Sequence, residues 1–505
     1  MSDETKEEPK AAKAELYEPP AGAETTGTWS GGAEPIPYTA SASWIVLRKQ
    51  EKPAAEIFSV SYVADAADPD RPVMFVFNGG PGASSAYLHV GVVGPQRVAF
   101  PADGTLPELP PRLVENEASW LAFADLVFVD PVGTGFSRVI EPDKKKDDAA
   151  RNGKDAKDDA ADPKEYFGWK RDLESLCEFM GRWLSSHGRW ASPIFIAGES
   201  YGGYRVGRLV KMLQETAGIG LNGAILISPA LEIASLAGTD YDVVPWVDLV
   251  PTMAAAAAHH GRLRAFAAGT PLDEVLREAE AFATGDFASF LARGASMEPP
   301  ERERILTRLA DLIGLPGDLV ARAEGRITIR VFTRELLRDE RKVLGLYDAT
   351  LTVTDPFPDR DPFAGPDPTL SGFSPAYTMG INRLLRSEIG VETDREYELL
   401  SYEVNRAWKD DTEAPAFQPA PGATDDFRYG MSLNPHLKAF IAHGRYDLVT
   451  PYYASDRLRN LMRLDPDTAA RLTVRHFGGG HMFYAWEESR QAFSEAIAAF
   501  VADAL

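Results

Sequence analysis

The segment around Ser200 constrains the fold of this chain more than any other. Ser200 lies in the string Gly198-Glu199-Ser200-Tyr201-Gly202, directly after the apolar run 193–197. That run is typical of a buried strand, and residues 204–213 carry apolar side chains at helical spacing. A strand that turns so sharply into a helix needs small residues two before and two after the serine. The string therefore predicts a nucleophile elbow, with the serine hydroxyl exposed at the top of a sheet.

A five-residue pattern can also arise by chance, and the alternative is a glycine–serine turn without chemistry. Further short apolar runs favour the elbow: Pro72–Phe77, Leu126–Asp130, Ala224–Ile227, Leu437–Ala442 and Leu472–Arg475. Continuous apolar runs of this length are typical of parallel strands buried on both faces. The alternation of such strands with helical segments predicts an α/β-hydrolase fold. Its central sheet would be mostly parallel, with helices on both faces.

The chain divides into four stretches by composition. Residues 1–35 are charged and then rich in small residues, which predicts a disordered tail. Residues 36–231 form the first part of the core, beginning with an expected antiparallel hairpin and including a mixed-charge surface insertion at 141–165. The strand–helix alternation stops over residues 232–430, which we expect to be a large, mainly helical cap insertion. Residues 431–505 complete the core with two strands and a final helix.

Bulk properties exclude several classes of partner. The chain has 505 residues, 44% of them hydrophobic, and a formal net charge of −22. That charge disfavours nucleic acid and anionic membranes. No run of about 18 apolar residues occurs, so we expect no transmembrane helix. Residues 1–8 do not resemble a signal peptide, which favours a cytoplasmic protein, with a trimmed signal as the alternative.

The single cysteine, Cys177, allows no intramolecular disulfide, and its place on an apolar helix face predicts a packed thiol. One cysteine and eight scattered histidines offer no structural zinc site. We therefore expect neither a metal nor an organic cofactor. The oligomeric state is left open.

A serine nucleophile needs a histidine to take its proton and a carboxylate to orient that histidine. In the expected fold the chain order is serine, acid, histidine, each on a loop after a strand. Asp447 follows the predicted strand that ends at Ala442. His481 follows the last predicted strand and three glycines. Taken singly, His481 could be a surface histidine and Asp447 a helix cap, but their order favours catalysis.

An oxyanion hole needs two backbone donors. The N–H of Tyr201, directly after the nucleophile, is the first candidate. The second should come from a loop after an early strand, and Asn78-Gly79-Gly80-Pro81-Gly82 fits that position. Its alternative is an ordinary glycine–proline turn.

The same loop carries a family resemblance. Asn78–Ser85 resembles the signature of serine carboxypeptidases, the family of carboxypeptidase Y and cathepsin A. The similarity continues in order through Gly94-Pro95, the string Asp130–Ser137, the elbow, Asp447 and Gly480-His481-Met482.

The resemblance implies release of a C-terminal amino acid through an acyl-enzyme. It assigns Ser200, Asp447 and His481 to a catalytic triad. It assigns the N–H groups of Gly80 and Tyr201 to the oxyanion hole. Substrate-binding roles fall to four residues: Asn78, Gly79, Glu199 and Met482.

Three departures from the family pattern are visible. Ala83 stands where many members have a cysteine, so the chain resembles a bacterial-type member without disulfides. Val92 stands where the family often has a second glutamate, and Phe483-Tyr484 replaces a small, proline-containing sequence. Glu199 would still meet the substrate carboxylate. Because two like charges cannot both stay ionised cheaply, binding should weaken as pH rises, and the pKa of Glu199 should be raised.

Three functions follow in order of preference. The first is a serine carboxypeptidase acting on peptides with a free C-terminus. The second is an esterase, amidase or acyltransferase that uses the same three residues, and Val92 keeps it open because it removes the usual second acid. The third is a catalytically silent binding protein, which would have no need of nucleophile, acid, base and both oxyanion loops together.

Overall fold

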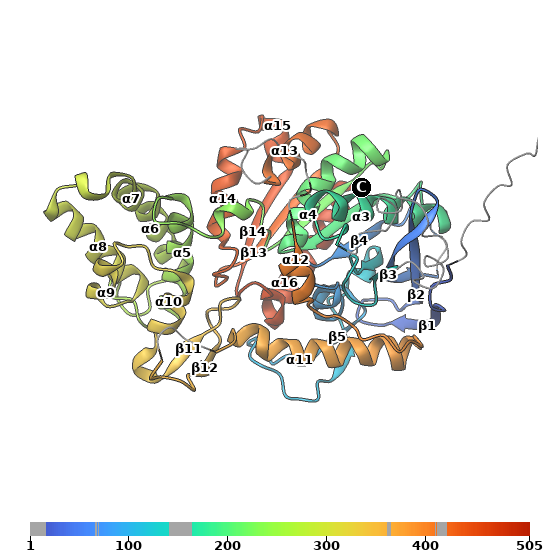
Figure 1. Cartoon of the computed structure of the whole chain (residues 1–505), viewed down its shortest axis with the longest axis horizontal. Helices are drawn as coiled ribbons and strands as arrows, with labels where there is room; N and C mark the ends of the chain where they lie inside the picture. The colour runs from blue at the N-terminus through green and yellow to red at the C-terminus, as the bar shows by residue number, and fades with distance from the viewer. Residues whose placement is uncertain are drawn as a thin grey trace, which may run out of the picture.

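A mixed β-sheet forms the centre of the molecule (Figure 1). The computed structural model describes residues 17–65, 68, 70–140, 164–360, 365–409, 411 and 422–505. Within these ranges one sheet has ten strands, in the order β1-β2-β3-β7-β4-β9-β10-β13-β14, with β8 paired to β3. Neighbours from β7 to β14 run parallel, and β1, β2, β3 and β8 form an antiparallel edge. The strands are β1 (Ala23–Trp29), β2 (Ile36–Lys49), β3 (Lys52–Ala64), β4 (Val73–Phe77), β7 (Asp125–Val129), β8 (Arg138–Val139), β9 (Ile194–Glu199), β10 (Gly223–Ile227), β13 (Lys438–Gly444) and β14 (Leu472–Phe477).

Every residue of β4 is buried, because the strand has a hydrophobic core on each side. Met74 and Val76 point into one core, and Val73, Phe75 and Phe77 point into the other. The continuous apolar run thus meets two layers of helices, as the sequence predicted. The expected hairpin is also confirmed, since β2 pairs antiparallel with β3.

Helices cover both faces of the sheet. On one face lie α3 (Trp169–Ser186), α4 (Tyr201–Met212) and α13 (Thr424–Leu433), whose buried apolar side chains share a core. On the other face lie α11 (Pro368–Arg383) and α16 (Glu487–Ala504). Each helix has one apolar face and therefore buries it against the sheet. The mostly parallel sheet with helices on both faces is confirmed.

A separate helical unit lies beside the sheet (Figure 1). It contains α5 (Val244–His259), α6 (Leu272–Phe282), α7 (Ala288–Arg293), α8 (Pro299–Ile313), α9 (Gly317–Arg322) and α10 (Ile329–Glu335). The unit has its own apolar core, which extends to Tyr446, Leu448 and Tyr452 of the sheet domain. The predicted insertion 232–430 is therefore mainly helical but not a single cap, because α11 and α13 leave the unit and pack on opposite faces of the sheet.

The N-terminal prediction is wrong in part. Residues 1–35 were expected to be a disordered tail, but residues 23–29 form β1, which pairs with β2 along its whole length. The exposed and half-buried positions of β1 alternate, because it is an edge strand over a single layer. Its threonines favour a strand, but it lacks the apolar alternation that would have announced one. Residues 141–163 of the predicted surface insertion lie outside the described residues.

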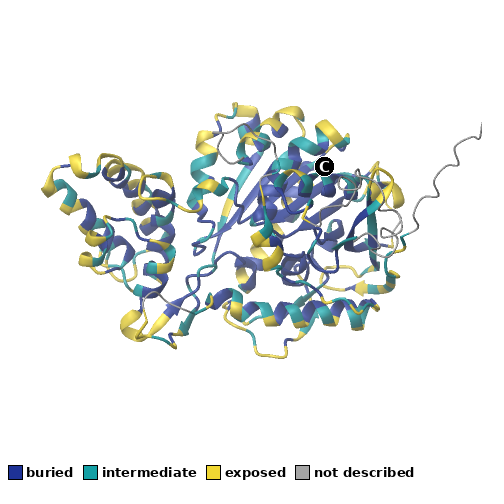
Figure 2. Cartoon of the chain, viewed as in Figure 1, coloured by how far each residue is buried: buried dark blue, intermediate teal, exposed yellow. Residues whose placement is uncertain are grey.

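The centre of the sheet is more deeply buried than the elements around it (Figure 2). The central strands are dark blue, the edge strands β1 and β2 include teal and yellow residues, and exposed residues gather on the outer helices and loops. Among the described helices, none is both long and apolar enough to cross a membrane.

Replacing Phe75 tests the two-sided core. Its ring meets Trp183 edge-on at 5.4 Å and Phe179 at 6.5 Å, and its side chain is fully buried. Phe75→Ala should lower the free energy of unfolding by about 3–5 kcal/mol, because a large cavity forms between strand and helix. Denaturant titration measures the loss. Tyr241→Ala, at a side chain that is 96% exposed, should change stability by less than about 0.5 kcal/mol. A loss below about 1 kcal/mol for Phe75→Ala would contradict this packing.

Candidate active site

The elbow places Ser200 between β9 and α4. Its backbone has φ 62° and ψ −122°, a conformation that non-glycine residues rarely adopt. The Ser200 N–H donates to Ile227 O at 2.9 Å, and the Ser200 carbonyl accepts from Gly203 N at 2.9 Å. These bonds hold the strained residue at the end of the strand. The hydroxyl thereby faces the cavity at the carboxyl ends of the parallel strands.

The glycines beside Ser200 are required by close packing. A Cβ on Gly198 would lie 2.2 Å from Gly202 O, and a Cβ on Gly203 would lie 2.4 Å from Pro229 Cβ. The loop after β4 approaches equally closely, since a Cβ on Gly79 would lie 2.4 Å from Tyr201 N. The elbow and that loop can meet only because these positions carry no side chain.

Asp447 and His481 form a hydrogen-bonded pair. His481 Nδ1 lies 2.6 Å from Asp447 Oδ2, and both side chains are buried. The other oxygen of Asp447 accepts from the N–H groups of Val449 and Thr450. Asp447 therefore accepts from Nδ1–H, which leaves Nε2 of His481 free to take a proton.

Hydrogen bonds from the Thr450 side chain and from the backbone N–H groups of Gly480 and His481 hold Asp447 and His481 in place. Thr450 Oγ1 lies 2.6 Å from Asp447 Oδ2 and 3.0 Å from Ser228 O. The His481 N–H donates to Tyr347 O at 2.5 Å, and the preceding Gly480 N–H donates to Asp348 Oδ2 at 3.0 Å. Burial alone lowers the pKa of His481, but the charge and hydrogen bond of Asp447 outweigh it, so that the pKa is raised.

Asn78 joins the loop after β4 to the elbow. Its side-chain amide donates to Glu199 Oε2, and its side-chain oxygen accepts from Leu88 N at 3.0 Å. Its backbone carbonyl accepts from Arg205 Nη1 at 2.5 Å. Arg205 is itself buried and pairs with Asp172 through two N–H groups, at 2.7 and 3.1 Å. A paired, buried arginine on α4 thus holds Asn78 against Glu199.

Glu199 is buried directly beside the nucleophile. Loss of hydration raises the pKa of its carboxyl from 4.5 to about 7. His481, Tyr484 and Asn78 lower that pKa, and Asp447 raises it further. At neutral pH Glu199 therefore exists as both acid and carboxylate, and in its acid form it can donate a hydrogen bond to another carboxylate.

The predicted site residues line one small cavity of about 60 Å³. Seven of them meet there: Asn78, Gly79, Gly80, Glu199, Ser200, His481 and Met482. Tyr201 is buried and offers only its N–H. In the described part of the chain, neither the Tyr201 N–H nor the Gly80 N–H is taken by another hydrogen bond.

Sequence reasoning missed five residues of the wall: Ala83, Tyr87, Tyr347, Leu370 and Leu400. Three of them come from the predicted insertion, far along the chain from the elbow. No local signal marks these positions, because only tertiary packing brings them to the cavity.

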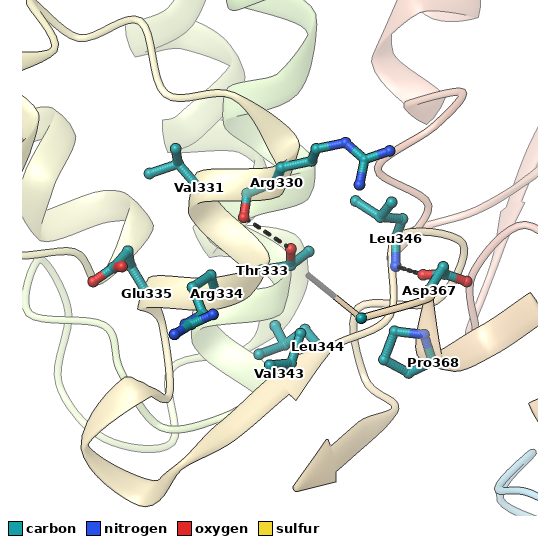
Figure 3. A pocket seen from close by; sticks show the side chains of 11 residues that line it. Arg330, Val331, Thr333, Arg334, Glu335, Val343, Leu344, Leu346, Asp367 and Pro368 are labelled. Atoms are coloured by element: carbon teal, nitrogen blue, oxygen red, sulfur yellow. Dashed lines mark hydrogen bonds between the residues drawn. The ribbon is translucent and has the colours of Figure 1, made fainter. Parts of the chain in front are cut away.

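A second cavity, of about 340 Å³, lies between α10 and the strand β11 (Lys342–Leu344) (Figure 3). Leu346 and Pro368 line it, and their close neighbours Tyr347 and Leu370 line the first cavity. Asp367 ties the loop after β11 to the start of α11, since it accepts from Leu346 N at 2.6 Å and from Leu370 N at 2.8 Å. Residues that are close in sequence thus line the two cavities.

Comparison with known families supports the resemblance. The family model for serine carboxypeptidases matches residues 42–237, a segment that includes Asn78, Glu199 and Ser200 but ends before Asp447 and His481.

Among curated proteins, serine carboxypeptidase-like 13 of Arabidopsis thaliana is 27% identical over 40% of this chain and 42% of its own. Serine carboxypeptidase-like 36 of the same plant is 32% identical over 36% of this chain and 33% of its own. The pheromone-processing carboxypeptidase kex1 of Sclerotinia sclerotiorum is 30% identical over 30% of this chain and 19% of its own. The chain thus spans less than half the length of these relatives.

A solved structure extends the likeness of fold to nearly the whole chain. The prohormone-processing carboxypeptidase Kex1Δp from Saccharomyces cerevisiae aligns over 93% of this chain and 92% of its own, with a TM-score of 0.54 and 15% identity. At this identity the likeness concerns the fold alone, and the fold is that of the α/β hydrolases.

The buried acid Glu199 should cost stability at neutral pH. The pKa of Glu199 is raised on folding, so the unfolded chain loses its proton first as pH rises from about 4.5 to about 7. The native state is therefore destabilised over that interval. Between pH 5 and 8 the wild type should lose about 2–3 kcal/mol more unfolding free energy than Glu199→Gln, which has no proton to release.

Denaturant titrations at both pH values measure this difference. Glu403→Gln, at an exposed glutamate of the helix α12 (Tyr402–Ala407), is the matched control and should follow the wild type. Parallel pH dependence of the wild type and Glu199→Gln would contradict the burial argument.

Proposed function

We propose that this chain, whose residues 42–237 match the family model for serine carboxypeptidases, releases C-terminal amino acids from peptides through an acyl-enzyme on Ser200. The observation that carries the proposal is the placing of Glu199. A buried carboxyl with a pKa of about 7 lies beside the nucleophile and is hydrogen-bonded to Asn78. An esterase or amidase has no use for a group that favours a carboxylate partner.

The first chemical half uses Ser200 and His481. Nε2 of His481 takes the hydroxyl proton while Ser200 Oγ attacks the carbonyl of the last peptide bond. The N–H groups of Gly80 and Tyr201 stabilise the oxyanion. The tetrahedral intermediate then collapses, and the imidazolium gives its proton to the leaving amine. The hydrogen bond to Asp447 keeps Nδ1–H of His481 in place throughout.

The second half returns the enzyme to its starting state. A water molecule enters where the amino acid has left, gives a proton to Nε2 of His481, and attacks the acyl carbon. The same two N–H groups stabilise the second oxyanion. Collapse then breaks the bond to Ser200 Oγ, which recovers its proton from His481. The product is the shortened peptide with a new free carboxylate.

Selection of the chain end falls to Glu199 and Asn78. In its protonated form Glu199 donates a hydrogen bond to the terminal carboxylate of the substrate, and the Gly79 N–H adds a second donor. The Asn78 side chain already has both ends engaged, by Glu199 and by Leu88 N, so it holds Glu199 in position. The carboxylate would therefore bind one residue away from the attacked carbonyl, which restricts cleavage to the last peptide bond.

The first test compares substrates that differ only at their end. Wild type and Ser200→Ala are incubated with an N-blocked dipeptide and with its C-terminal amide and ester. The free acid should be cleaved with the highest kcat/KM, and Ser200→Ala should lower kcat by about 10⁴-fold or more. Chromatography of the released amino acid measures both. A preference for the amide or ester would favour the second function, and equal behaviour of the variant would leave only a binding role.

The second test follows the pH dependence. The pKa of Glu199 is about 7, so KM for the free acid should rise as pH passes through about 7, because Glu199 loses the proton that it shares. KM for the ester should stay constant over that range. The raised pKa of His481 should in turn lower kcat for both substrates at acid pH, because the base must be unprotonated. A KM that rises equally for acid and ester would contradict the role given to Glu199.

A further inference from the structure

A cluster of unsatisfied polar groups lies around Glu199. In the described part of the chain, Glu199 Oε1 and the hydroxyls of Tyr87, Tyr377 and Tyr484 are buried and have no hydrogen-bond partner. Buried polar atoms are nearly always satisfied, so four such atoms in one place require an explanation. Buried polar atoms of this kind are satisfied either by one another or by a bound ligand.

The four groups are neighbours. The ring centroids of Tyr87 and Tyr377 lie 5.0 Å apart. The charge of Glu199 raises the pKa of both phenols. As a nearby hydrogen-bond donor, Tyr484 lowers the pKa of Glu199. The other two tyrosines raise the pKa of Tyr484. Tyr87 lines the catalytic cavity, whereas Tyr377 and Tyr484 are not among the residues that line it.

The ring of Tyr484 packs against Gly91, which has no side chain. A Cβ on Gly91 would lie 2.8 Å from the Tyr484 ring and 3.1 Å from the Tyr377 hydroxyl. Gly91 precedes Val92 in the π-helix η1 (His89–Val93), which lies against the short helix η9 (Phe483–Ala485). The two departures noted in the sequence, Val92 and Tyr484, thus lie on segments that pack against each other beneath the cavity.

Phenols differ from carboxyls in one decisive property. Burial raises the pKa of Tyr484 and Tyr377 well above 10, so both stay neutral donors throughout the physiological range. Asn78 and His481 also lower the pKa of Glu199, and Asp447 raises it. Arg490 lowers the pKa of Tyr377. Near neutral pH these phenols therefore stay uncharged, whereas Glu199 changes charge. A second described carboxyl with a raised pKa, Asp348 at about 6, follows the cavity residue Tyr347 and accepts from the Gly480 N–H.

We propose that Tyr484 is the positioning residue of the carboxylate clamp: its hydroxyl donates to Glu199 Oε1, and Tyr87 donates to the bound carboxylate from the cavity wall. The clamp then contains a single titrating group in place of a pair of carboxyls. This inference rests on the proposed function, since it concerns the same carboxylate. Its consequence is that affinity for a free C-terminus depends on one proton and persists to neutral pH.

Tyr484→Phe tests the role of the hydroxyl while keeping the ring. The Tyr484 hydroxyl lowers the pKa of Glu199, so its removal should raise that pKa, and Glu199 of the variant should stay protonated to higher pH. The pH at which KM for the N-blocked dipeptide acid rises should move upward by roughly one unit. The ester, measured alongside, should show no such movement. An unchanged midpoint would overturn the inference, because a merely structural role would not move it.

The matched control is Tyr38→Phe, on β2, which removes a hydroxyl from a tyrosine that does not line the cavity. Its midpoint should equal that of the wild type. Failure of the wild type to cleave any free acid would contradict the proposed function itself. Cleavage with an unmoved midpoint in Tyr484→Phe contradicts only the role of Tyr484.

Proton counting tests the single titrating group without any tyrosine variant. Binding of the N-blocked dipeptide acid to Ser200→Ala is measured by calorimetry in buffers of different ionisation heat. At pH 8 binding should take up about one proton per site, and at pH 5.5 close to none, because Glu199 is then already protonated. The C-terminal amide should take up none at either pH. Uptake of two protons, or of none at pH 8, would overturn the inference.

Discussion

The strained backbone of Ser200 is the constraint on which the site depends. A non-glycine residue with φ 62° costs about 1–3 kcal/mol and persists only where its surroundings hold it. Here β10 supplies the bond from Ile227, and the elbow glycines allow the chain to touch itself. The same closeness brings the loop at Gly79 against the first turn of α4. One local distortion thus sets Ser200, the proposed oxyanion donors Gly80 and Tyr201, and the neighbouring Glu199 relative to one another.

Charge around the elbow follows from burial. The carboxyls of Asp447 and Glu199 both lie close to His481, but they differ in their hydrogen-bond partners. Asp447 receives two backbone N–H groups and a histidine, so its charge is paired. Glu199 receives one amide, and burial raises its pKa to about 7. One carboxyl is therefore engaged by hydrogen bonds to a histidine and to backbone N–H groups, and the other, Glu199, is left able to share a proton. The stability given up at Glu199 is the expected cost of such a site.

Local signals predicted the parts of this structure that local chemistry determines. The buried strands, the elbow, the loops that carry Asp447 and His481, and the final helix follow from short apolar runs, glycines and helical spacing, and the structure has them where they were expected. Parts that depend on distant packing were missed. β1 is a polar edge strand that only β2 stabilises, and α11 and α13 cover the sheet although they follow the helical unit in sequence. Tyr347, Leu370 and Leu400 reach the cavity for the same reason.

The origin of the cavity walls bears on how specificity is divided. In the proposed function, recognition of the chain end would use the loop after β4 and the elbow, which belong to the sheet domain and are held by a buried arginine pair. Much of the remaining wall comes from segments between the helical unit and α16, namely Tyr347, Leu370, Leu400 and Met482. The cavity has a volume of about 60 Å³. In the proposed function, selection among C-terminal residues would depend on how Tyr347, Leu370 and Met482 pack around the leaving group. The chemistry and the side-chain preference thus rest on different parts of the fold, and the second can change while the first is kept.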